Sequence, residues 1–443
     1  GSSVISLLMD KNSLELEPAD PFMKSEFDLT TEKISKKEVL VKVKNSNISQ
    51  KISKTIFKSA KADYKQTNAV FLPNITISHT GMVTNNPLMA FGSKLNQEIL
   101  TQNDFNPVLL NDPDQIQNFA TRIEIQQPII NVDGLYQRKA AKLTMKAQAL
   151  QVERASDYLD FEVEKTYMQL QLAYKGLTVL EKSLKAANEN KRLADNSFKQ
   201  GYLQRADVLL VEVRVTEVKN QLHTAKSNIE NVSNYLSFLM NDKSDVIYKP
   251  SDDLINNIEL STAYKVSENR SDIMAMQLAT ATYKTMNKAD KMAFLPRLNA
   301  FGSYEMYDNK LLQGNANGYL VGAQLSWDIF KGSKRFGKAQ KSKAEFEKSK
   351  LEYNQYVSKS NLELNKVKRQ LVDAKNRLEL TSLAVQQSEE SLRIRKNRFK
   401  EGLEKTSDLL IAETQFAKKQ LEYYQTIFEY NFTQTYLEFL TKQ

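Results

Sequence analysis

The chain has 443 residues and few Gly (13) or Pro (9), while Lys, Glu, Gln, Leu and Ala dominate, a composition typical of long helices. It lacks cysteine, which excludes disulfides and thiolate metal sites, and it has no apolar run of about 18 residues that could form a transmembrane helix. The net charge of +9 is spread in mixed-sign clusters, so a solvated helical face accounts for it better than nucleic-acid binding. Because the first residue is Gly rather than Met, we expect a processed or trimmed chain, and the earlier loss of a signal peptide stays open.

Residues 1–33 contain Pro18 and Pro21 among acidic side chains, and we expect them to form an extended N-terminal arm. From residue 34 to about residue 68, apolar side chains recur at helical spacing in a stretch rich in Lys and Ser, which predicts a helix. Phe71-Leu72-Pro73 ends this helix, because proline disfavours the helical conformation at the residue before it.

Between residues 71 and 130 the apolar period changes from that of a helix to that of a strand, which predicts a β-hairpin. Its strands, residues 74–80 and 119–127, each have one apolar and one polar face, and a polar loop separates them. Their lengths approach the roughly 9–11 residues that cross a bilayer when tilted. The apolar faces are formed by Ile75, Ile77 and His79 in the first strand and by Phe119, Thr121, Ile123 and Ile125 in the second.

A long helix without proline is predicted from about residue 134 to residue 199. It would be roughly 100 Å long at about 1.5 Å per residue. A turn at Gly201 separates it from a helix of about half that length near residues 207–239, and residues 241–260 are expected to form an irregular spacer. Apolar residues of the long helix follow one another at spacings of four and three, as in coiled coils. They are Val163, Tyr167, Leu170, Tyr174, Leu177 and Leu184.

The second half, residues 261–443, repeats this order of elements, beginning with a helix. A second β-hairpin is predicted over residues 294–330, with strands at 298–304 and 319–327. Aromatic residues at the strand ends, such as Trp327, fit the interfacial belt of a membrane barrel. A second long helix and a shorter one follow. The coiled-coil positions of the long helix are Leu364, Val367, Leu371, Ala374, Leu378 and Val385.

The two halves are related by duplication, because the sequence around Gly201 returns around Gly402 at a constant offset. We therefore divide the chain after the arm into a first repeat over residues 34–240, the spacer 241–260 and a second repeat over residues 261–443. In each turn Gly supplies a permissive backbone, and the Asp that follows is positioned to cap the next helix. The matching pairs are Phe198 and Phe399, Gly201 and Gly402, Asp207 and Asp408, and Glu212 and Glu413.

Four strands with an apolar face cannot close a barrel in lipid, because an open edge leaves unpaired backbone groups at a cost of several kcal/mol each. If the strands span a membrane, the chain must therefore oligomerise. Three copies supply twelve strands, which is wide enough for a lumen. The residues alone thus predict an oligomeric barrel continued by a helical tube.

Several short motifs occur in one consistent order along nearly the whole chain. They are Phe71-Leu72-Pro73 and Phe294-Leu295-Pro296 at strand entries, Gln127-Pro-Ile-Ile and Trp327-Asp-Ile-Phe at strand exits, Glu268-Asn-Arg-Ser-Asp-Ile273, and the two Phe-x-x-Gly-x-x-x-x-x-Asp-x-Leu turns. With these motifs the sequence resembles the TolC family of outer-membrane efflux and secretion channels of Gram-negative bacteria. The resemblance implies an α+β membrane protein with an internal two-fold repeat. Its trimer would form a 12-stranded β-barrel, four strands per chain, continued by a long α-helical coiled-coil barrel.

The resemblance further implies a passive exit duct in the cell outer membrane, with its helical tunnel in the periplasm. Such a duct is a homotrimer surrounded by outer-membrane lipid, and it works with a periplasmic adaptor (membrane fusion) protein and an inner-membrane pump of the RND or ABC type. It would conduct drugs, small molecules or proteins in a tripartite efflux pump or a type I secretion system, and it needs no nucleic acid. The alternative is a soluble elongated coiled-coil scaffold without a channel, which explains the heptads but not the two hairpins.

In the TolC family the two glycine turns form the periplasmic tip, where the tunnel narrows and the adaptor docks. Asp408, six residues after Gly402, matches the position of a constricting aspartate ring. Three such carboxylates in a narrow pore would repel one another and bind cations. Asp207 is the equivalent residue of the first turn. The structural alternative for both residues is N-capping of the next helix.

Three residues depart from the family's gate. Ile411 stands where a second aspartate is common, so a second ring would be apolar. Glu404 replaces a basic residue, which removes a possible salt bridge between helices, and Phe399 replaces a tyrosine, so that closure would depend on packing. Adaptor docking is expected at Gly201, Tyr202, Gly402 and Leu403. The neighbouring basic run, which either assists docking or is a solvated helix face, consists of Arg393, Arg395, Lys396, Arg398 and Lys400.

Residues for catalysis or cofactor binding do not stand out. The only histidines, His79 and His223, have no neighbours at metal-ligand spacing, and we expect both at the surface. No phosphate-binding glycine loop and no nucleophile motif occurs. We therefore expect no enzyme activity, no cofactor and no metal, with the energy for transport coming from partner proteins.

Overall fold

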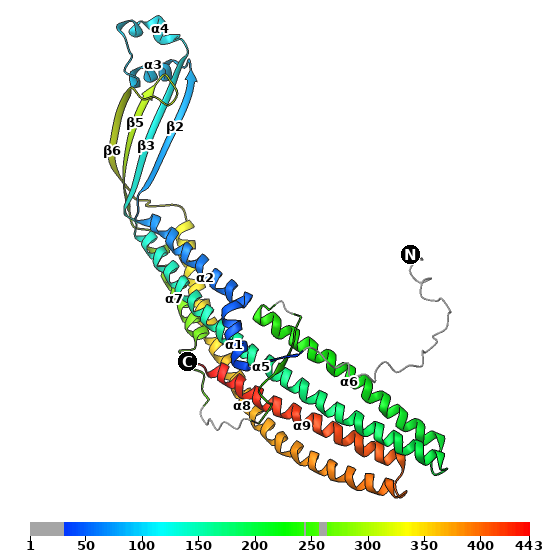
Figure 1. The fold of residues 1–443 in the computed structure, drawn as a ribbon. Helices are drawn as coiled ribbons and strands as arrows, with labels where there is room; N and C mark the ends of the chain where they lie inside the picture. Colours follow the sequence, from blue (N-terminus) through cyan, green and yellow to red (C-terminus); the bar gives the residue numbers. More distant parts are fainter. Residues whose placement is uncertain (1–30, 243–244, 257–263) are drawn as a thin grey trace, which may run out of the picture. The chain divides into compact units, whose positions relative to one another are not determined.

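The computed structural model describes residues 31–242, 245–256 and 264–443 (Figure 1). The chain divides into two compact units. The helical unit comprises residues 1–43, 166–255 and 383–428, as far as they are described, and the sheet unit comprises residues 44–165, 256–382 and 429–443. Each unit draws segments from both sequence repeats, and the limits of the repeats stay a prediction.

The sheet unit contains one four-stranded antiparallel sheet in the order β2-β3-β5-β6. Its strands are β2 (Asn74–Thr84), β3 (Ile116–Ile130), β5 (Arg297–Asp308) and β6 (Ala316–Ser326). Both predicted hairpins are confirmed, and pairing of β3 with β5 joins them into a single sheet. Within the described residues β2 and β6 are edge strands, so one chain does not close a barrel.

The two faces of this sheet differ in polarity, as the alternation of side chains predicts. One row of the apolar face crosses all four strands through Ile77, Ile123, Tyr304 and Tyr319. On the opposite face, called the polar face, Arg122 lies 3.3 Å from Glu305 and 3.8 Å from Glu124. Charged side chains are costly in lipid, so the polar face is the one suited to a water-filled lumen.

The connection between β2 and β3 is not the polar loop that the sequence led us to expect. It contains α3 (Pro87–Asn96), the 3-10 helix η3 (Gln102–Phe105) and α4 (Pro107–Asn111). Pro87 and Pro107 lie in the first turns of α3 and α4, where the missing N–H costs nothing, and the side chains of Asn86 and Asn106 cap these helices. The prolines that suggested a loop therefore start helices.

Two helical hairpins contain the four longest helices of the described residues. In the first, α5 (Val132–Lys199) leads to α6 (Arg205–Met240), and in the second, α8 (Lys334–Lys400) leads to α9 (Thr406–Thr441). The predicted long helices and their shorter partners are confirmed. Heptad residues are buried in both long helices, with Val163, Leu170 and Val367 fully inaccessible to solvent. Among the helices of the described residues, none combines the length and the apolar character needed to cross a membrane.

The helix predicted over residues 34–68 is interrupted. It consists of α1 (Lys36–Ser46), α2 (Ile48–Gln66) and the 3-10 helix η2 (Thr67–Val70). Asn47 breaks it, because its side chain accepts a hydrogen bond from the Gln50 N–H and so caps the start of α2. In the second repeat, α7 (Ser271–Met292) begins later than predicted, and residues 257–263 lie outside the described part of the chain.

Two short strands lie where irregular segments were predicted. β1 (Thr31–Ile34) belongs to the predicted arm and β4 (Ile247–Pro250) to the predicted spacer, and the two pair in parallel. Strands of four residues are too short to show a period in the sequence. Residues 1–30 of the predicted arm lie outside the described residues.

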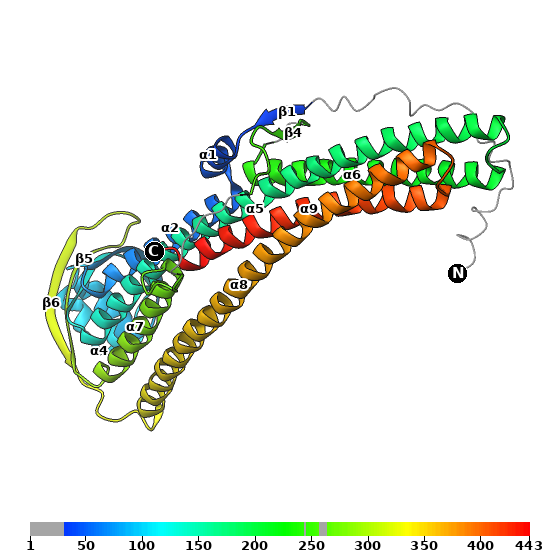
Figure 2. The ribbon, with the colours of Figure 1, turned by 90° about the horizontal axis from the view of Figure 1, so that it is seen from below.

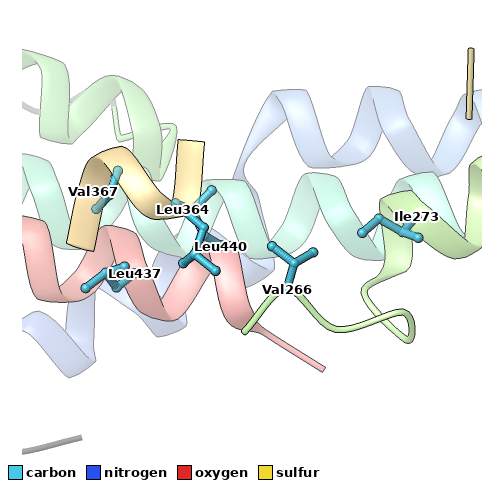
Figure 3. Close-up of a cluster of buried hydrophobic side chains, with 6 residues drawn as sticks. All are labelled: Val266, Ile273, Leu364, Val367, Leu437 and Leu440. Carbon is cyan, nitrogen blue, oxygen red and sulfur yellow. The ribbon is translucent and has the colours of Figure 1, made fainter. Parts of the chain in front are cut away.

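Each unit has its own apolar core. In the helical unit, α5 and α6 pack through Leu180, Val218 and Leu222. In the sheet unit, α7, α8 and α9 and the segment before α7 meet in a second cluster (Figure 3). Its buried members are Val266, Ile273, Leu364, Val367, Leu437 and Leu440. Full burial of one such side chain stabilises by about 1.5–3 kcal/mol, so packing holds these helices more than intrinsic helicity does.

The sheet unit also contains a buried ionic junction. Arg270 donates two hydrogen bonds to Asp272, from Nε at 2.6 Å and from Nη2 at 2.8 Å. Arg154 of α5 lies 3.6 Å from the same carboxylate, and the hydroxyl of Tyr356 in α8 donates to it. Arg270 also donates to the carbonyl oxygen of Leu440 in α9 at 2.8 Å. The junction therefore ties four helices together.

Candidate gate and docking site at the helical turns

Both helical hairpins turn on a glycine whose backbone is left-handed. The φ angle is +79° at Gly201 and +74° at Gly402. The N–H of Tyr202 donates to the carbonyl five residues earlier at 2.8 Å, and the N–H of Leu403 does the same at 2.9 Å. With the second bond made by each glycine N–H, this is the Schellman motif, in which a residue with a Cβ is strained. The two repeats thus build the same turn twice.

The residues predicted to dock an adaptor lie at the ends of these turns. Tyr202 is 79% exposed and Leu403 is 65% exposed. At Gly201 and Gly402 no neighbouring atom lies within 4 Å of the position a Cβ would take. Each turn therefore presents an exposed apolar side chain beside bare backbone, which a partner helix can approach closely.

Asp207 and Asp408 occupy equivalent positions in the first turns of α6 and α9. Asp207 accepts a hydrogen bond from the N–H of Gln204 at 3.2 Å, as part of a capping box. The N-cap residue is Gln204 and not Asp207. Asp207 still helps to cap α6, because its side chain bonds to the backbone of the N-cap residue. Asp408 is half-buried and makes no such bond to Lys405 within the described chain.

Asp408 lines a groove of about 380 Å³ between α8 and α9. Ile411, one turn further along α9 and 62% exposed, lines the same groove, so the predicted acidic and apolar gate positions share one face. The basic side chains of Arg395 and Lys419 also line it. The remaining lining residues are Ala384, Gln387, Ser388, Ser391, Ala412 and Gln415.

Glu404 forms ion pairs within its own hairpin. Its side chain is 10% exposed and lies 2.9 Å from Arg395 Nη1 and 2.9 Å from Arg398 Nε. The sequence predicted only that Glu404 removes a possible salt bridge between helices. It did not predict the ion pairs with Arg395 and Arg398, which hold the turn against the end of α8. Phe399, in the last turn of α8, is half-buried, and its carbonyl oxygen accepts the N–H of Gly402 at 3.0 Å.

The basic run beside the second turn is largely engaged inside the hairpin. Arg395 and Arg398 contact Glu404, and Arg393 lies 2.6 Å from Glu390 in the same helix. These pairs favour the solvated-face alternative over a docking surface for the run.

A buried polar cluster near the turns was missed by the sequence reasoning. Glu413 of α9 is 4% exposed and accepts a hydrogen bond from the side chain of Asn190 in α5. Burial raises the pKa of the Glu413 carboxyl, and the positive charges of Arg214 in α6 and Lys396 in α8 oppose that rise. The cluster joins α9 to the first hairpin. Its one sequence signal was the match of Glu212 with Glu413 between the repeats.

Both ring nitrogens of His79, the histidine of the sheet, have hydrogen-bond partners within the chain. Nδ1 of His79 lies 2.8 Å from the hydroxyl of Thr121, and Nε2 accepts the N–H of Leu312 at 3.3 Å. Across the described ranges, no group of three His, Cys, Asp or Glu side chains is placed to hold a metal ion.

Comparison with known proteins identifies the family. The sequence pattern of the family described as outer membrane efflux protein matches residues 55–242 and 262–437, which include both hairpins and both glycine turns. The chain belongs to this family. It is therefore an outer-membrane exit duct of an efflux system, as the resemblance implied. Among curated proteins, none matches the sequence.

Three solved structures of outer-membrane proteins share the fold. The CmeC channel of Campylobacter jejuni has 17% identity and a TM-score of 0.79, with 91% of this chain and 85% of that chain covered. VceC of Vibrio cholerae has 16% identity and a TM-score of 0.75, covering 91% and 95%. The open state of the MtrE channel of Neisseria gonorrhoeae has 15% identity and a TM-score of 0.74, covering 92% and 89%. The TolC-like fold expected from the sequence is confirmed.

Proposed function

We propose that this efflux duct is a homotrimer whose twelve strands close one barrel. The observation that carries the proposal is the four-stranded sheet, which has an apolar face and, in the described chain, two unpartnered edges at β2 and β6. In lipid each unpaired backbone group costs several kcal/mol, so each edge must meet the edge of another copy. Lipid then surrounds the apolar face, and the polar face lines the lumen.

The gate of the duct lies at the two glycine turns. Asp408 and Ile411 share one groove, so three copies present an acidic ring followed by an apolar ring. Asp207 contributes less, because its carboxylate is engaged in the capping box of α6. Packing of Phe399 and the ion pairs of Glu404 hold the second turn in the closed state. Opening requires the hairpins to move apart at this end.

The ends of the turns are the docking points for a periplasmic adaptor protein. Tyr202 and Leu403 offer apolar contacts, and the adjacent glycines let a helical partner approach the backbone. The adaptor links the duct to an inner-membrane pump of the RND or ABC type, which supplies the energy and selects the drug, small molecule or protein that is exported. The duct itself then needs no catalytic residue and no cofactor. A soluble scaffold would leave the apolar face of the sheet without a role.

The gate is tested by the variant Asp408→Asn in planar bilayers. At about 4 Å in water one carboxylate attracts a cation by about 1 kcal/mol, so a ring of three contributes about 3 kcal/mol, or about a hundredfold in the blocking constant. We expect a higher basal conductance and a block by cations that weakens by up to that factor for each positive charge of the blocking ion. Ile411 is unaffected, so the apolar ring remains.

The matched control is Glu401→Gln, which removes the same charge from an exposed residue of the turn that does not line the groove. It should leave the conductance and the block nearly unchanged. Equal behaviour of the Asp408→Asn channel and the parent channel would remove Asp408 from the gate. The absence of any channel current from the parent protein would instead contradict the duct itself.

A further inference from the structure

The segment between β2 and β3, residues 85–115, is called the β2–β3 insertion. It contains regular structure, the helices α3, η3 and α4, and belongs to the sheet unit. Figure 1 shows its helices α3 and α4 at the end of the strands. Lys94 of α3 lies 3.1 Å from Asp104, whose carboxylate also accepts the N–H of Thr101 at 2.7 Å. The rings of Phe91 and Phe105 meet edge to face at 5.7 Å. These contacts join α3 to η3, and α4 packs against both of them, so the three helices form one body.

The insertion is anchored to the polar face of the sheet. The side-chain amide of Gln97 donates to Asn118 Oδ1 and to the backbone oxygen of Gln117, both at 2.9 Å. Asn118 precedes Arg122 by four residues on β3, so it shares the face of the Arg122–Glu305 ion pair. On α3, the small residues Ala90 and Ser93 lie in line with Gln97 and are fully buried. Figure 2 shows β5 and β6 curving around the region in which α4 lies.

The insertion exposes several apolar side chains, and on α3 Leu88 lies on the side opposite Gln97. Leu88 is 81% exposed and Val108 is 72% exposed. The other exposed apolar side chains include Leu95 and Phe105. Because the insertion is on the polar face, these side chains lie on the lumen side and not against lipid. An apolar patch in such a place marks a contact with another protein surface.

The dimensions of a closed barrel bring the insertions together. Twelve strands about 4.8 Å apart and tilted by about 40° close to a cylinder about 24 Å across. A helix with its side chains is about 10–12 Å wide, so three helices laid against the inner wall leave little room between them. The exposed apolar sides of the three insertions then point toward one axis.

We propose that the β2–β3 insertions of three copies meet through Leu88 and Val108 and form a second constriction at the outer mouth of the duct. This constriction is separate from the glycine turns, and it rests on the trimeric barrel proposed above. Its partner surface is a second copy of this chain. The short β5–β6 connection, residues 309–315, is held toward the apolar face instead, because the N–H of Leu312 donates to Nε2 of His79 at 3.3 Å.

The proposal is tested by cross-linking in the intact trimer. The chain has no cysteine, so Val108→Cys and Leu88→Cys each introduce a single reactive site. With a short bismaleimide, we expect each variant to give a covalent dimer on a denaturing gel. Cross-linking should also lower the conductance of the channel by several-fold. Val321→Cys on the apolar face of β6, which is 75% exposed, is the matched control and should give neither effect.

Two results would overturn the constriction. In a heat-modifiable trimer, efficient single-site labelling of Val108→Cys and Leu88→Cys without covalent dimers would show that the insertions stand apart. Covalent capture of a different outer-membrane protein by these cysteines, again without chain dimers, would assign the apolar surface to another partner. Loss of the heat-modifiable trimer in the parent protein would contradict the trimeric duct itself, so the two failures are distinguishable.

Discussion

Glu413 and Asp408 lie five residues apart on α9 but have different surroundings. Asp408 lines a groove, whereas Glu413 is buried and receives a hydrogen bond from Asn190. Burial favours the neutral form of Glu413 and raises its pKa, against the charges of Arg214 and Lys396. Two carboxylates on one helix are therefore suited to different tasks, one to meeting cations and the other to holding hairpins together.

The raised pKa of Glu413 predicts a pH-dependent stability. The folded chain binds the proton of the Glu413 carboxyl more tightly than the unfolded chain does. The stabilisation of the fold by this proton is therefore complete below the ordinary pKa of 4.5 and is lost as the pH rises through the raised pKa of Glu413. Glu413→Gln should remove that dependence. Thermal unfolding followed by circular dichroism should show little difference between variant and parent at pH 4 and a growing advantage of the variant above it.

The control for this prediction is Glu212→Gln, the equivalent position in the first repeat, which is only half-buried. Its effect on the melting temperature should not change with pH. A Glu413→Gln effect that is the same at every pH would show that the carboxyl does not titrate in the folded state as proposed.

Which residue contacts could be predicted depended on their distance in the sequence. The turns at Gly201 and Gly402 were predictable, because a repeated glycine between two helical patterns has a local cause. Glu404 pairs with Arg395 and Arg398, which lie at most nine residues before it. These ion pairs were close enough in the sequence to be predicted, but the prediction considered only the basic residue that Glu404 replaces. Asn190 and Glu413 are far apart in the sequence and meet only after the hairpins pack, so no spacing rule could join them.

At the scale of elements, the ionic junction of Arg270 and Asp272 explains part of the motif that opens the second repeat. Burial is the largest single influence on Asp272 and by itself would raise its pKa. Hydrogen bonds from Arg270 and Tyr356, with the charges of Arg154 and Arg270, outweigh it and hold the pKa below the ordinary value of 3.8. The carboxylate is thus ionised where it joins the helices.

Replacing Asp272 with Asn should destabilise the sheet unit. Breaking a buried ion pair by removing one partner costs about 3–5 kcal/mol, because the remaining charge stays buried. Urea unfolding at neutral pH should show this loss, and the difference from the parent should shrink as the pH falls through the lowered pKa of Asp272. Asp290→Asn is the control on the same helix, because Asp290 pairs at 3.7 Å with Lys338, whose side chain is 66% exposed. An equal loss for both variants would contradict the special role of the junction.

The secondary structure could be predicted where the sequence pattern favours only one local conformation. Strands β2 and β3 followed from alternation, and α5 and α8 from heptads. At Asn47 and Pro87 the pattern allows two structures. Asn inside a helical pattern can be either a surface residue or a cap, and Pro can either end or begin a helix. The sequence therefore suggested one helix where there are two, and a loop where α3 and α4 lie.

For the whole molecule, the orientation of the sheet predicts which side of β6 tolerates charge. Val321 belongs to the apolar face and Gln324 to the polar face. Lysine at the middle of the bilayer costs about 2–4 kcal/mol per chain, whereas a lumen position remains hydrated. Val321→Lys should reduce the heat-modifiable trimer in outer-membrane fractions several-fold, and Gln324→Lys should leave it near the parent level. The opposite order would reverse the assignment of the faces.

The open sheet has a consequence for the chain before it reaches its membrane. A single newly made chain carries an exposed apolar face, with Ile77 70% and Tyr319 81% exposed, and two edges that any other strand can join. Exposed edges and apolar patches are templates for aggregation in water. The apolar face and the open edges of this sheet must therefore stay shielded from water and from other strands until the chain reaches lipid.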